Sequence, residues 1–326
     1  MGISRRNDLL SLRRELAIPT LELAYTEEGG IAIHAPHRLL VTGANGQLGR
    51  ELRNILQDIP SVSADFADKE VLDITDTGQV EAFFHNKHYS HIINCAAYTA
   101  VDRAETQPEQ CRSVNVDGVA NLLDAISGTT TVLVHISTDY VFDGEADRPY
   151  TETDTKHPLS VYGQTKSESE DLIMARRPDS IIVRTGWLFS AFGHNFVKTI
   201  LDRAARGASL RVVNDQTGTP TYAADLAASI LRIINHRASL PGIYHFSNLG
   251  QTSWYDFAKT IVAMAGLECV IEPCTTAQYG APAVRPAMSV LDKTKIINDF
   301  DFNIPHWEDA LSRCLKEIAK TANTHT

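Results

Sequence analysis

A glycine-rich turn stands between the first predicted strand and the first predicted helix of this chain. The apolar run Leu39–Val41 ends at Thr42, after which glycines occur at every third position from Gly43 to Gly49. Such glycines let the backbone turn sharply and approach a pyrophosphate, whose charge is stabilised by the N–H groups at the helix start. The turn therefore predicts a dinucleotide-binding unit, in which the cofactor contacts are expected from Gly43, Asn45, Gly46, Gln47, Leu48 and Gly49.

Short apolar runs alternate with amphipathic stretches after this turn. His91–Cys95, Val132–Ile136 and Ile181–Arg184 are predicted strands, with helices predicted over Val114–Ile126 and Ser160–Ala175. Strands that alternate with helices indicate a parallel sheet covered on both faces. The predicted fold class is α/β: a Rossmann-type, doubly wound parallel sheet with a smaller C-terminal substrate-binding domain.

The regular alternation stops beyond Arg184, where glycine and proline interrupt the pattern. Two helical stretches persist, over Tyr222–Ile234 and Ser253–Ala265. The predicted dinucleotide-binding domain covers residues 38–185, with 218–238 returning to it, and the substrate-binding domain covers 186–217 and 239–326. Residues 1–37 lie outside this pattern as an N-terminal extension of unknown role, in which leucines between positions 9 and 16 favour a short amphipathic helix.

Composition restricts the partners and the location that we expect. The 326 residues carry a formal charge of -10, which argues against nucleic-acid binding but not against a phosphorylated ligand held by local cations or helix N-termini. The chain contains no run of about 20 apolar residues and no signal-peptide pattern, so no membrane association and a cytoplasmic location are expected. The five cysteines form no C-x-x-C pair and are expected to be reduced.

Acidic residues beyond the turn are candidates for binding the adenosine part of a dinucleotide. A carboxylate about 20 residues after the glycines is expected to meet the ribose. Asp65 and Asp68 both satisfy this spacing near the end of the predicted second strand, and Asp68 is preferred. A solvated loop carboxylate is the alternative for both Asp65 and Asp68, and Asp73 and Ile74 are expected to flank the adenine.

Tyr162 and Lys166 stand four residues apart in the predicted helix that begins at Ser160, so they share one helix face. Thr138 follows the predicted strand Val132–Ile136 and therefore lies at the carboxyl edge of the sheet, where ligands bind in such folds.

Reduction of a carbonyl needs a proton at the oxygen while a hydride reaches the carbon. A tyrosine has an ordinary pKa near 10, which a neighbouring lysine cation lowers together with the charge on oxidised nicotinamide. We therefore expect Tyr162 to donate the proton, Lys166 to assist it, and Thr138 to hydrogen-bond the ketone.

Several motifs of this chain resemble those of the extended short-chain dehydrogenase/reductases. The glycine turn, Ser137–Gly144 and Tyr162–Lys166 carry the resemblance to that superfamily. Further segments are similar to the dTDP-4-dehydrorhamnose reductases in particular: Asn94–Asp102 with Glu105, Arg184–Trp187, Gly193–Phe196, Asn214–Gln216 and Arg285–Pro286. The resemblance covers roughly residues 38 to 315.

The resemblance implies reduction of dTDP-4-dehydro-6-deoxy-L-mannose to dTDP-L-rhamnose with NADPH or NADH, by a monomer or homodimer. It implies that Asp139 holds a sugar hydroxyl and that Arg285 contacts the pyrophosphate, where a cation is needed. A surface ion pair is the alternative for Arg285, and a core aromatic is the alternative for Trp187. The other positions that the resemblance assigns are Ala96, Ala97 and Tyr98 for the cofactor, and Thr138, Trp187, Asn195 and Gln216 for the substrate.

Some members of the resembled family form a metal-bridged dimer through glutamates. Glu51 lies in a compatible stretch, but Ala224 and Asp225 stand where another glutamate is expected, so Mg²⁺ is disfavoured and no metal ligand is predicted.

Two other functions remain open from the sequence. A sugar-nucleotide dehydratase needs an Asp-Glu pair after the threonine, but Tyr140 follows Asp139 here, and this weakens the dehydratase or epimerase alternative. A non-catalytic NADP-binding regulatory subunit, such as the beta subunit of methionine adenosyltransferase, shares the same motifs. Turnover distinguishes that subunit from an enzyme.

Overall fold

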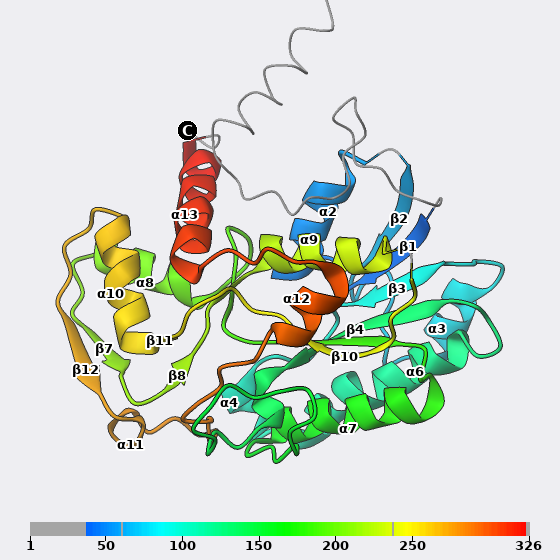
Figure 1. The fold of residues 1–326 in the computed structure, drawn as a ribbon, viewed down its shortest axis with the longest axis horizontal. Helices are drawn as coiled ribbons and strands as arrows, with labels where there is room; N and C mark the ends of the chain where they lie inside the picture. The colour runs from blue at the N-terminus through cyan, green and yellow to red at the C-terminus, as the bar shows by residue number, and fades with distance from the viewer. Residues whose placement is uncertain (1–36, 60, 237, 324–326) are drawn as a thin grey trace, which may run out of the picture.

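The computed structural model describes residues 37–59, 61–236 and 238–323 (Figure 1). The short helix expected near positions 9–16 lies outside these ranges. Within them, no helix is long and apolar enough to cross a membrane. All five cysteines, which lie in these ranges, are free thiols.

A six-stranded sheet with the order β10-β5-β4-β3-β1-β2 organises the larger part of the molecule. Every neighbouring pair in it is parallel. Because β2 and β3 lie on opposite sides of β1, the direction of winding reverses between β1 and β3, and a crevice for ligands opens at such a point. The strands are β1 (His37–Thr42), β2 (Val62–Ala67), β3 (His91–Asn94), β4 (Val132–Thr138), β5 (Ile181–Thr185) and β10 (Gly242–His245).

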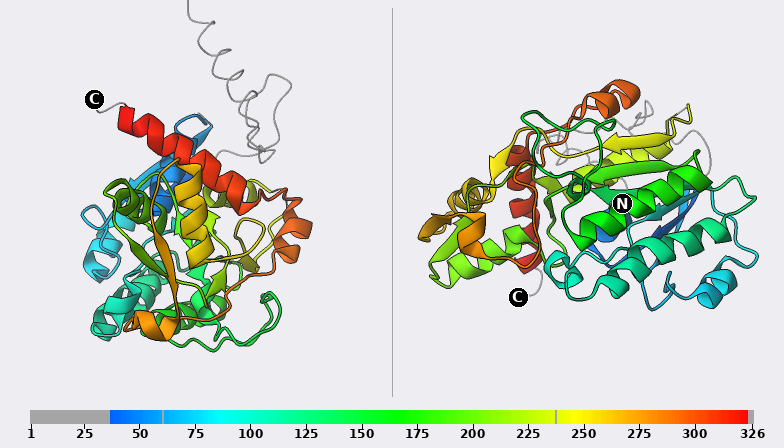
Figure 2. Two further views of the ribbon diagram at one scale, coloured as in Figure 1. Left: turned by 90° about the vertical axis from the view of Figure 1, so that its left-hand side faces the viewer. Right: turned by 90° about the horizontal axis from the view of Figure 1, so that it is seen from below.

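Helices cover both faces of this sheet, which confirms the predicted α/β class (Figures 1 and 2). Alternate strand residues serve the two faces: Leu39 packs with Leu52 of one helical layer, whereas Leu40 packs with Leu122 of the other. The first layer holds α2 (Gln47–Leu56), α9 (Ala223–Ile234) and α12 (Thr294–Phe300). The second holds α3 (Thr77–Phe84), α6 (Gly118–Ala125) and α7 (Val161–Arg176). The helix expected over 114–126 is thus split, since the π-helical turn η1 (Ser113–Asp117) precedes α6.

A small lobe, on the left in Figure 1, packs around its own apolar core. Phe189, Ile200, Phe257 and Trp307 are buried in that core. Its elements are β6 (Leu188–Phe189), α8 (Phe196–Ala205), β7 (Leu210–Val213), β8 (Thr217–Gly218), β9 (Thr221–Tyr222), β11 (Thr252–Ser253), α10 (Trp254–Met264), β12 (Ile271–Cys274), α11 (Thr276–Tyr279) and α13 (Trp307–Asn323). Short elements near the carboxyl edge of the large sheet are α4 (Val101–Ala104), α5 (Pro108–Arg112) and the 3₁₀ turn η2 (Asp139–Val141).

The sheet pairing corrects one part of the sequence-based division. Residues 239–326 were assigned to the substrate-binding domain, but β10 pairs with β5 in the large sheet and Phe300 packs in the core beside it. The pattern was missed because Gly-Ile-Tyr-His is a short and mixed segment, without the apolar run that marks the other strands.

Candidate active site

A cleft of about 810 Å³ opens at the carboxyl ends of β1, β3 and β4 and reaches the small lobe. Eighteen of the twenty residues predicted to form the site line it: Gly43, Asn45, Gly46, Gln47, Leu48, Gly49, Asp68, Asp73, Ile74, Ala96, Ala97, Tyr98, Thr138, Asp139, Tyr162, Lys166, Trp187 and Asn195. Gln216 and Arg285 do not line it. One cavity therefore joins the glycine turn to the residues expected to handle the ketone.

The three glycines of the turn have different reasons for lacking a side chain. Gly43 has a φ of +60°, and a Cβ there would stand 2.7 Å from the Ala96 nitrogen. A Cβ on Gly49 would stand 2.6 Å from the Cα of Ala44, so both positions are closed by backbone packing. Gly46 is different, because its Cβ would meet only the Gly43 carbonyl oxygen, at 3.2 Å. The space beside Gly46 thus belongs to the cleft.

The start of α2 provides backbone donors at this end of the cleft. Gly46 is the N-cap, contributes no side-chain cap, and is followed by a first turn without acidic residues. An anion is therefore the favoured partner for the N–H groups and the positive end of the helix dipole.

The structure distinguishes the two candidate ribose-binding carboxylates. Asp68 follows β2 directly, lines the cleft and is hydrogen-bonded to the Asn45 amide. Asp65 instead accepts a 2.6 Å hydrogen bond from the Tyr89 hydroxyl and does not line the cleft. Asp68, the preferred candidate, therefore has the access that a ribose contact requires.

Close packing at Gly163 brings the candidate catalytic helix to the end of β4. A Cβ on Gly163 would stand 2.3 Å from the carbonyl oxygen of Tyr140, so only glycine permits this approach. Ser160 caps the helix by accepting a 3.2 Å hydrogen bond from the Gly163 nitrogen. The Tyr162 ring then lies edge-on to the Tyr140 ring, with centroids 5.7 Å apart. The glycine of the Tyr-Gly-Gln-Thr-Lys segment therefore sets the position of Tyr162.

Burial, not Lys166, has the largest effect on the pKa of Tyr162. Burial raises this pKa well above its ordinary value, and the Thr138 hydroxyl opposes the rise through a side-chain hydrogen bond. Besides burial, the groups that act on this pKa are Thr138, Asp139, Tyr140 and Cys111, and Lys166 is not among them. The lowering expected from Lys166 and oxidised nicotinamide stays a prediction for the cofactor-bound protein. Tyr162 is consequently a protonated phenol throughout the neutral range, which is the form that a proton donor needs.

Lys166 is almost completely buried, with 1% of its surface exposed. Its ammonium group donates a 2.7 Å hydrogen bond to the Ile136 carbonyl and lies 2.8 Å from Nε2 of His135. Burial lowers the pKa of Lys166 to about 8. The lysine is therefore held firmly and loses its proton more readily than an exposed lysine does.

Asp139 presents an unpartnered buried oxygen at the cleft. Oδ1 accepts a 3.1 Å hydrogen bond from Thr138, but Oδ2 has no hydrogen-bond partner among the described residues. Burial raises the pKa of Asp139 to about 6, and the nearby Ser289 hydroxyl opposes the rise without reaching hydrogen-bond geometry. A buried acceptor without a partner is costly, so this oxygen suits a ligand that supplies a hydroxyl donor.

Comparison with known proteins agrees with this arrangement. The model of a family described as the RmlD substrate binding domain matches residues 37–320. The chain belongs to this family. A curated relative, the dTDP-4-dehydrorhamnose reductase of Aggregatibacter actinomycetemcomitans, is 44% identical over 284 residues, which are 84% of this chain and 97% of the relative.

Solved structures of family members share the fold. The dTDP-4-dehydrorhamnose reductase of Clostridium acetobutylicum superposes with a TM-score of 0.83 at 40% identity, covering 86% of this chain and 99% of the other. The Bacillus anthracis dTDP-4-dehydrorhamnose reductase, solved in complex with NADP, gives a TM-score of 0.81 at 37% identity, with the same coverage. The family and its Rossmann-type fold, both expected from the motifs, are confirmed.

Trp187 and Asn195 place the small lobe against the cleft of this RmlD-family chain. The Trp187 ring stacks on that of Trp254, with centroids 3.6 Å apart, and it also lines the cleft, so its packing in the lobe does not remove it from the site. Asn195 caps α8 and donates a 3.0 Å hydrogen bond to Gln47 at the start of α2. Trp254 also lines the cleft, but it was not among the predicted site residues, because in the sequence it is only the first residue of an amphipathic helix.

Gln216 and Arg285 are occupied elsewhere. Gln216 donates a 3.0 Å hydrogen bond to Thr276 of α11. Arg285 forms a two-pronged ion pair with Asp102 of α4, at 2.8 and 2.9 Å. Arg285 is therefore ion-paired in this structure, and it also acts on Tyr140, which lines the cleft.

Glu51, the candidate for a metal-bridged dimer, is buried and accepts a 2.6 Å hydrogen bond from Ser190. Burial raises the pKa of Glu51 to about 7. Asp225, near the position where another glutamate is expected, pairs with Arg313 at 2.6 and 2.7 Å. The described part of the chain holds no group of three His, Cys, Asp or Glu residues with metal-site geometry.

Proposed function

We propose that this protein reduces the 4-keto group of dTDP-4-dehydro-6-deoxy-L-mannose to give dTDP-L-rhamnose, with NADPH or NADH as reductant, in dTDP-rhamnose biosynthesis. The observation that carries the proposal is the meeting of the glycine turn with Thr138, Tyr162 and Lys166 in one cleft of an RmlD-family chain. We further infer a cytoplasmic enzyme, either a monomer or a homodimer, whose partner is a dTDP-sugar and not a nucleic acid or a membrane.

The cleft fits a dinucleotide at the glycine turn. The uncapped start of α2 and the open space at Gly46 suit the pyrophosphate, while Asp68 suits the adenosine ribose. Asp73 and Ile74 line the adenine end, and Ala96 to Tyr98 line the path toward Tyr162. When bound, NADPH or NADH supplies the hydride.

Thr138 and Tyr162 deal with the ketone oxygen. The Thr138 hydroxyl polarises the carbonyl by hydrogen bonding, and the Tyr162 phenol gives its proton as negative charge develops on that oxygen. A developing alkoxide is far more basic than a phenolate, so Tyr162 needs no lowered pKa to serve as the acid. The free oxygen of Asp139 accepts a sugar hydroxyl and thereby orients the ring.

The test is NAD(P)H oxidation by the dTDP-4-keto sugar, followed by absorbance, for the wild type and Tyr162→Phe. The variant keeps the ring but removes the transferable proton, so turnover should fall by about 10² or more while cofactor affinity is retained. Tyr244→Phe is a matched control, because Tyr244 is a buried tyrosine of β10 outside the cleft.

Each outcome has a distinct meaning. Near wild-type turnover in Tyr162→Phe would assign the proton to another acid. An inactive wild type that still binds the cofactor tightly would support a regulatory subunit. Release of water from a dTDP-hexose that carries a 4-hydroxyl, without net cofactor oxidation, would support a dehydratase, although Tyr140 occupies the position of the glutamate which that reaction needs.

A further inference from the structure

A row of buried polar side chains crosses the sheet beneath the candidate catalytic lysine. Thr42, Asn94 and His135 are lateral neighbours on β1, β3 and β4. Thr42 donates a 2.6 Å hydrogen bond to Asn94 Oδ1, and the amide nitrogen of Asn94 lies 3.0 Å from Nδ1 of His135. Nε2 of the same imidazole lies 2.8 Å from Nζ of Lys166. Each member of this row is at most 1% exposed.

The row determines which nitrogen of His135 carries the proton. The backbone N–H of Ala96 donates to Asn94 at 3.2 Å, so the atom that it meets must be the amide oxygen. The amide nitrogen of Asn94 then faces Nδ1 of His135, which must accept. A neutral imidazole with a bare Nδ1 carries its proton on Nε2, directed at Lys166. This contact is favourable when the lysine is an amine and unfavourable when it is an ammonium.

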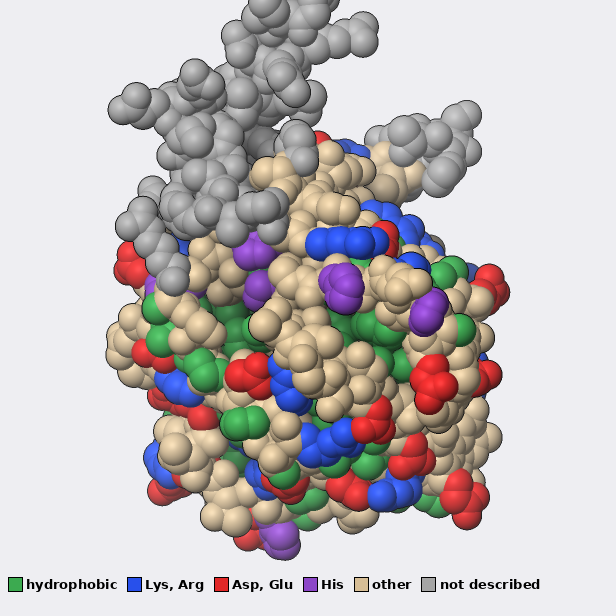
Figure 3. Space-filling view, turned by 90° about the vertical axis from the view of Figure 1, so that its right-hand side faces the viewer, with side chains coloured by type: hydrophobic (Ala, Val, Ile, Leu, Met, Phe, Trp, Pro, Cys, Tyr) green, Lys and Arg blue, Asp and Glu red, His purple; other side chains and the backbone are tan. Residues whose placement is uncertain are grey.

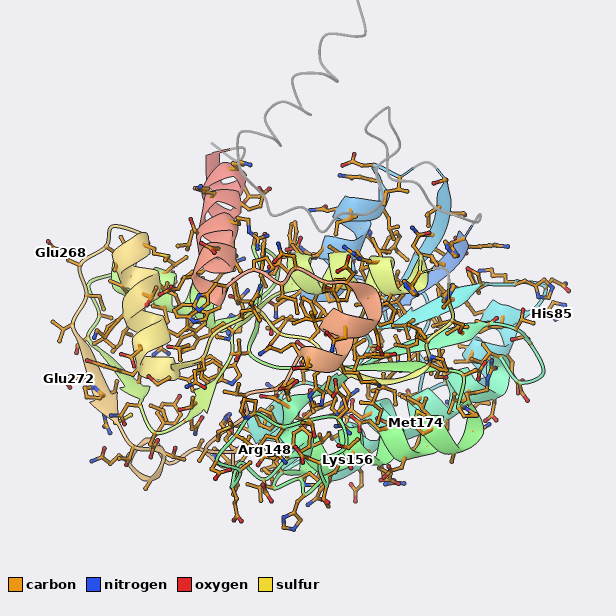
Figure 4. All side chains as sticks on the ribbon, viewed as in Figure 1. His85, Arg148, Lys156, Met174, Glu268 and Glu272 are labelled. Atoms are coloured by element: carbon orange, nitrogen blue, oxygen red, sulfur yellow. The ribbon has the colours of Figure 1, made fainter. Side chains whose placement is uncertain are left out.

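No carboxylate among the described residues contacts Lys166 directly, although the charge of Glu170 favours its ammonium form. Glu170, one turn further along α7, is already bound by Arg184 at 2.7 and 2.9 Å and by Lys156 at 3.4 Å. Lys156, which is labelled in Figure 4, lies beside α7 and reaches Glu170 from there. Besides Glu170, the titratable groups that affect the pKa of Lys166 are the thiols of Cys111 and Cys95. The row ending at His135 is thus its closest polar environment apart from the Ile136 carbonyl.

We propose that His135 is a positioning residue for the reduction, which holds Nζ of Lys166 in place and stabilises the lysine each time it gives up its proton. The proposal rests on the proposed function for its role in turnover, while the His135–Lys166 coupling itself stands on geometry alone.

The proton transfers balance over one cycle. As hydride reaches the carbonyl carbon, the C=O π bond breaks and Tyr162 passes its phenolic proton to the oxygen, leaving a phenolate. The Lys166 ammonium returns a proton to that phenolate and becomes a neutral amine. The amine accepts a hydrogen bond from Nε2–H of His135, and a solvent proton restores the ammonium before the next cycle.

The coupling is tested without substrate, by ¹⁵N NMR of histidine-labelled full-length protein between pH 6 and 10. The His135 resonances are assigned by their loss in His135→Gln. We expect Nδ1 to be unprotonated and Nε2 to be protonated, with a Nε2 shift that follows the titration of Lys166 and disappears in Lys166→Met. A proton on Nδ1, or a titration unchanged in Lys166→Met, would overturn the proposal.

The role in turnover is tested by the pH profile of kcat. His135→Glu places a carboxylate beside Lys166, which favours the ammonium, so the alkaline limb should move upward by about 1–3 pH units while turnover at neutral pH falls. His135→Gln should move the limb in the same direction by less, and it serves if the glutamate variant does not fold. His245→Gln is the matched control, since His245 is also fully buried in the sheet but contacts Tyr150 and Arg184.

The outcomes separate the proposal from a structural role. Lower turnover with an unmoved alkaline limb in both His135 variants would show that His135 supports folding alone, and would refute the proposal. A limb that moves equally in His245→Gln would do the same. If the wild type does not turn over the keto sugar, the proposed function fails, and the NMR titration still decides the coupling.

Discussion

Gly46→Val separates the glycine that faces the ligand from the glycines that serve the fold. Gly46 has φ −71° and ψ 174°, extended values that valine adopts without strain. The added Cβ meets only the Gly43 carbonyl oxygen, at 3.2 Å, so a shift of a few tenths of an ångström accommodates it. Substitutions at Gly43 or Gly49 would instead force a Cβ into backbone atoms at 2.6–2.7 Å. The variant should therefore fold and place its side chain where the pyrophosphate needs to lie.

The size of the effect follows from the donors that the side chain blocks. Hydrogen bonds to a charged group contribute about 1.5–3 kcal/mol each. Loss of two such bonds to the pyrophosphate is about 3–6 kcal/mol, and every 1.4 kcal/mol changes affinity tenfold. The dissociation constant for NADPH should accordingly rise by about 10²- to 10⁴-fold.

Fluorescence titration with NADPH measures this change, and circular dichroism with thermal unfolding shows that the variant is folded. Gly78→Val is a suitable control, since Gly78 is exposed on α3 with only the Asp76 side chain nearby, at 3.5 Å. A folded Gly46→Val protein with wild-type affinity for NADPH would refute the assignment of this turn to the pyrophosphate.

Three further substitutions test the electrostatics of the buried groups. Burial raises the pKa of Glu51 from 4.5 to about 7, so its carboxylate destabilises the fold increasingly between these pH values. In urea unfolding, Glu51→Gln should have the same free energy of unfolding as the wild type at pH 4.5 and a free energy about 3 kcal/mol higher at pH 8. A variant that is more stable than the wild type only at the acidic pH would contradict this reasoning. Burial raises the pKa of Asp139 from 3.8 to about 6, so Asp139→Asn should also increase the free energy of unfolding as the pH rises, with the full gain above about pH 6. Turnover should fall. A gain over the wild type that is equal at pH 5 and pH 8 would argue against this. Arg184→Met removes the closer of the two cations that pair with the fully buried Glu170 and leaves only Lys156, at 3.4 Å. The free energy of unfolding in urea should fall by about 3–5 kcal/mol, and a loss below 1 kcal/mol would show that Lys156 compensates.

Local patterns were sufficient for the glycine turn and for the large sheet apart from β10. The run Leu39–Val41 is apolar because β1 is buried on both faces, and the helical spacing after it reflects the packing of α2 on one of these faces. The i, i+4 spacing of Tyr162 and Lys166 likewise requires only that α7 is a helix. Features of this kind depend on a few neighbouring residues, so a single sequence contains them.

Contacts between distant segments could not be predicted in this way. Arg285 and Asp102 are 183 residues apart, and nothing near either residue indicates that they pair. The same applies to Trp187 and Trp254, which stack only because α10 packs against the loop after β5. Charges of both signs are mixed on the face in Figure 3, and Glu268 and Glu272 lie at the outer edge of the small lobe in Figure 4. The composition shows that the chain has many charged residues, but it does not show where they lie on the surface.

The pKa of Tyr162 illustrates the limit most directly. Spacing in the sequence placed a lysine beside the tyrosine, and charge alone then predicted a lower pKa. The depth of burial instead raises the pKa of Tyr162 in this structure, because the buried phenolate loses its hydration. Burial also acts on Lys166, where it disfavours the ammonium, and His135 acts in the same direction. The two effects are complementary: Tyr162 keeps its proton until the alkoxide forms, and Lys166 is an ammonium that readily releases the proton which restores the phenol. A catalytic pair of this kind depends on how far each group is from water, and in this chain that distance is set by β4, by the close approach at Gly163 and by the polar row behind them.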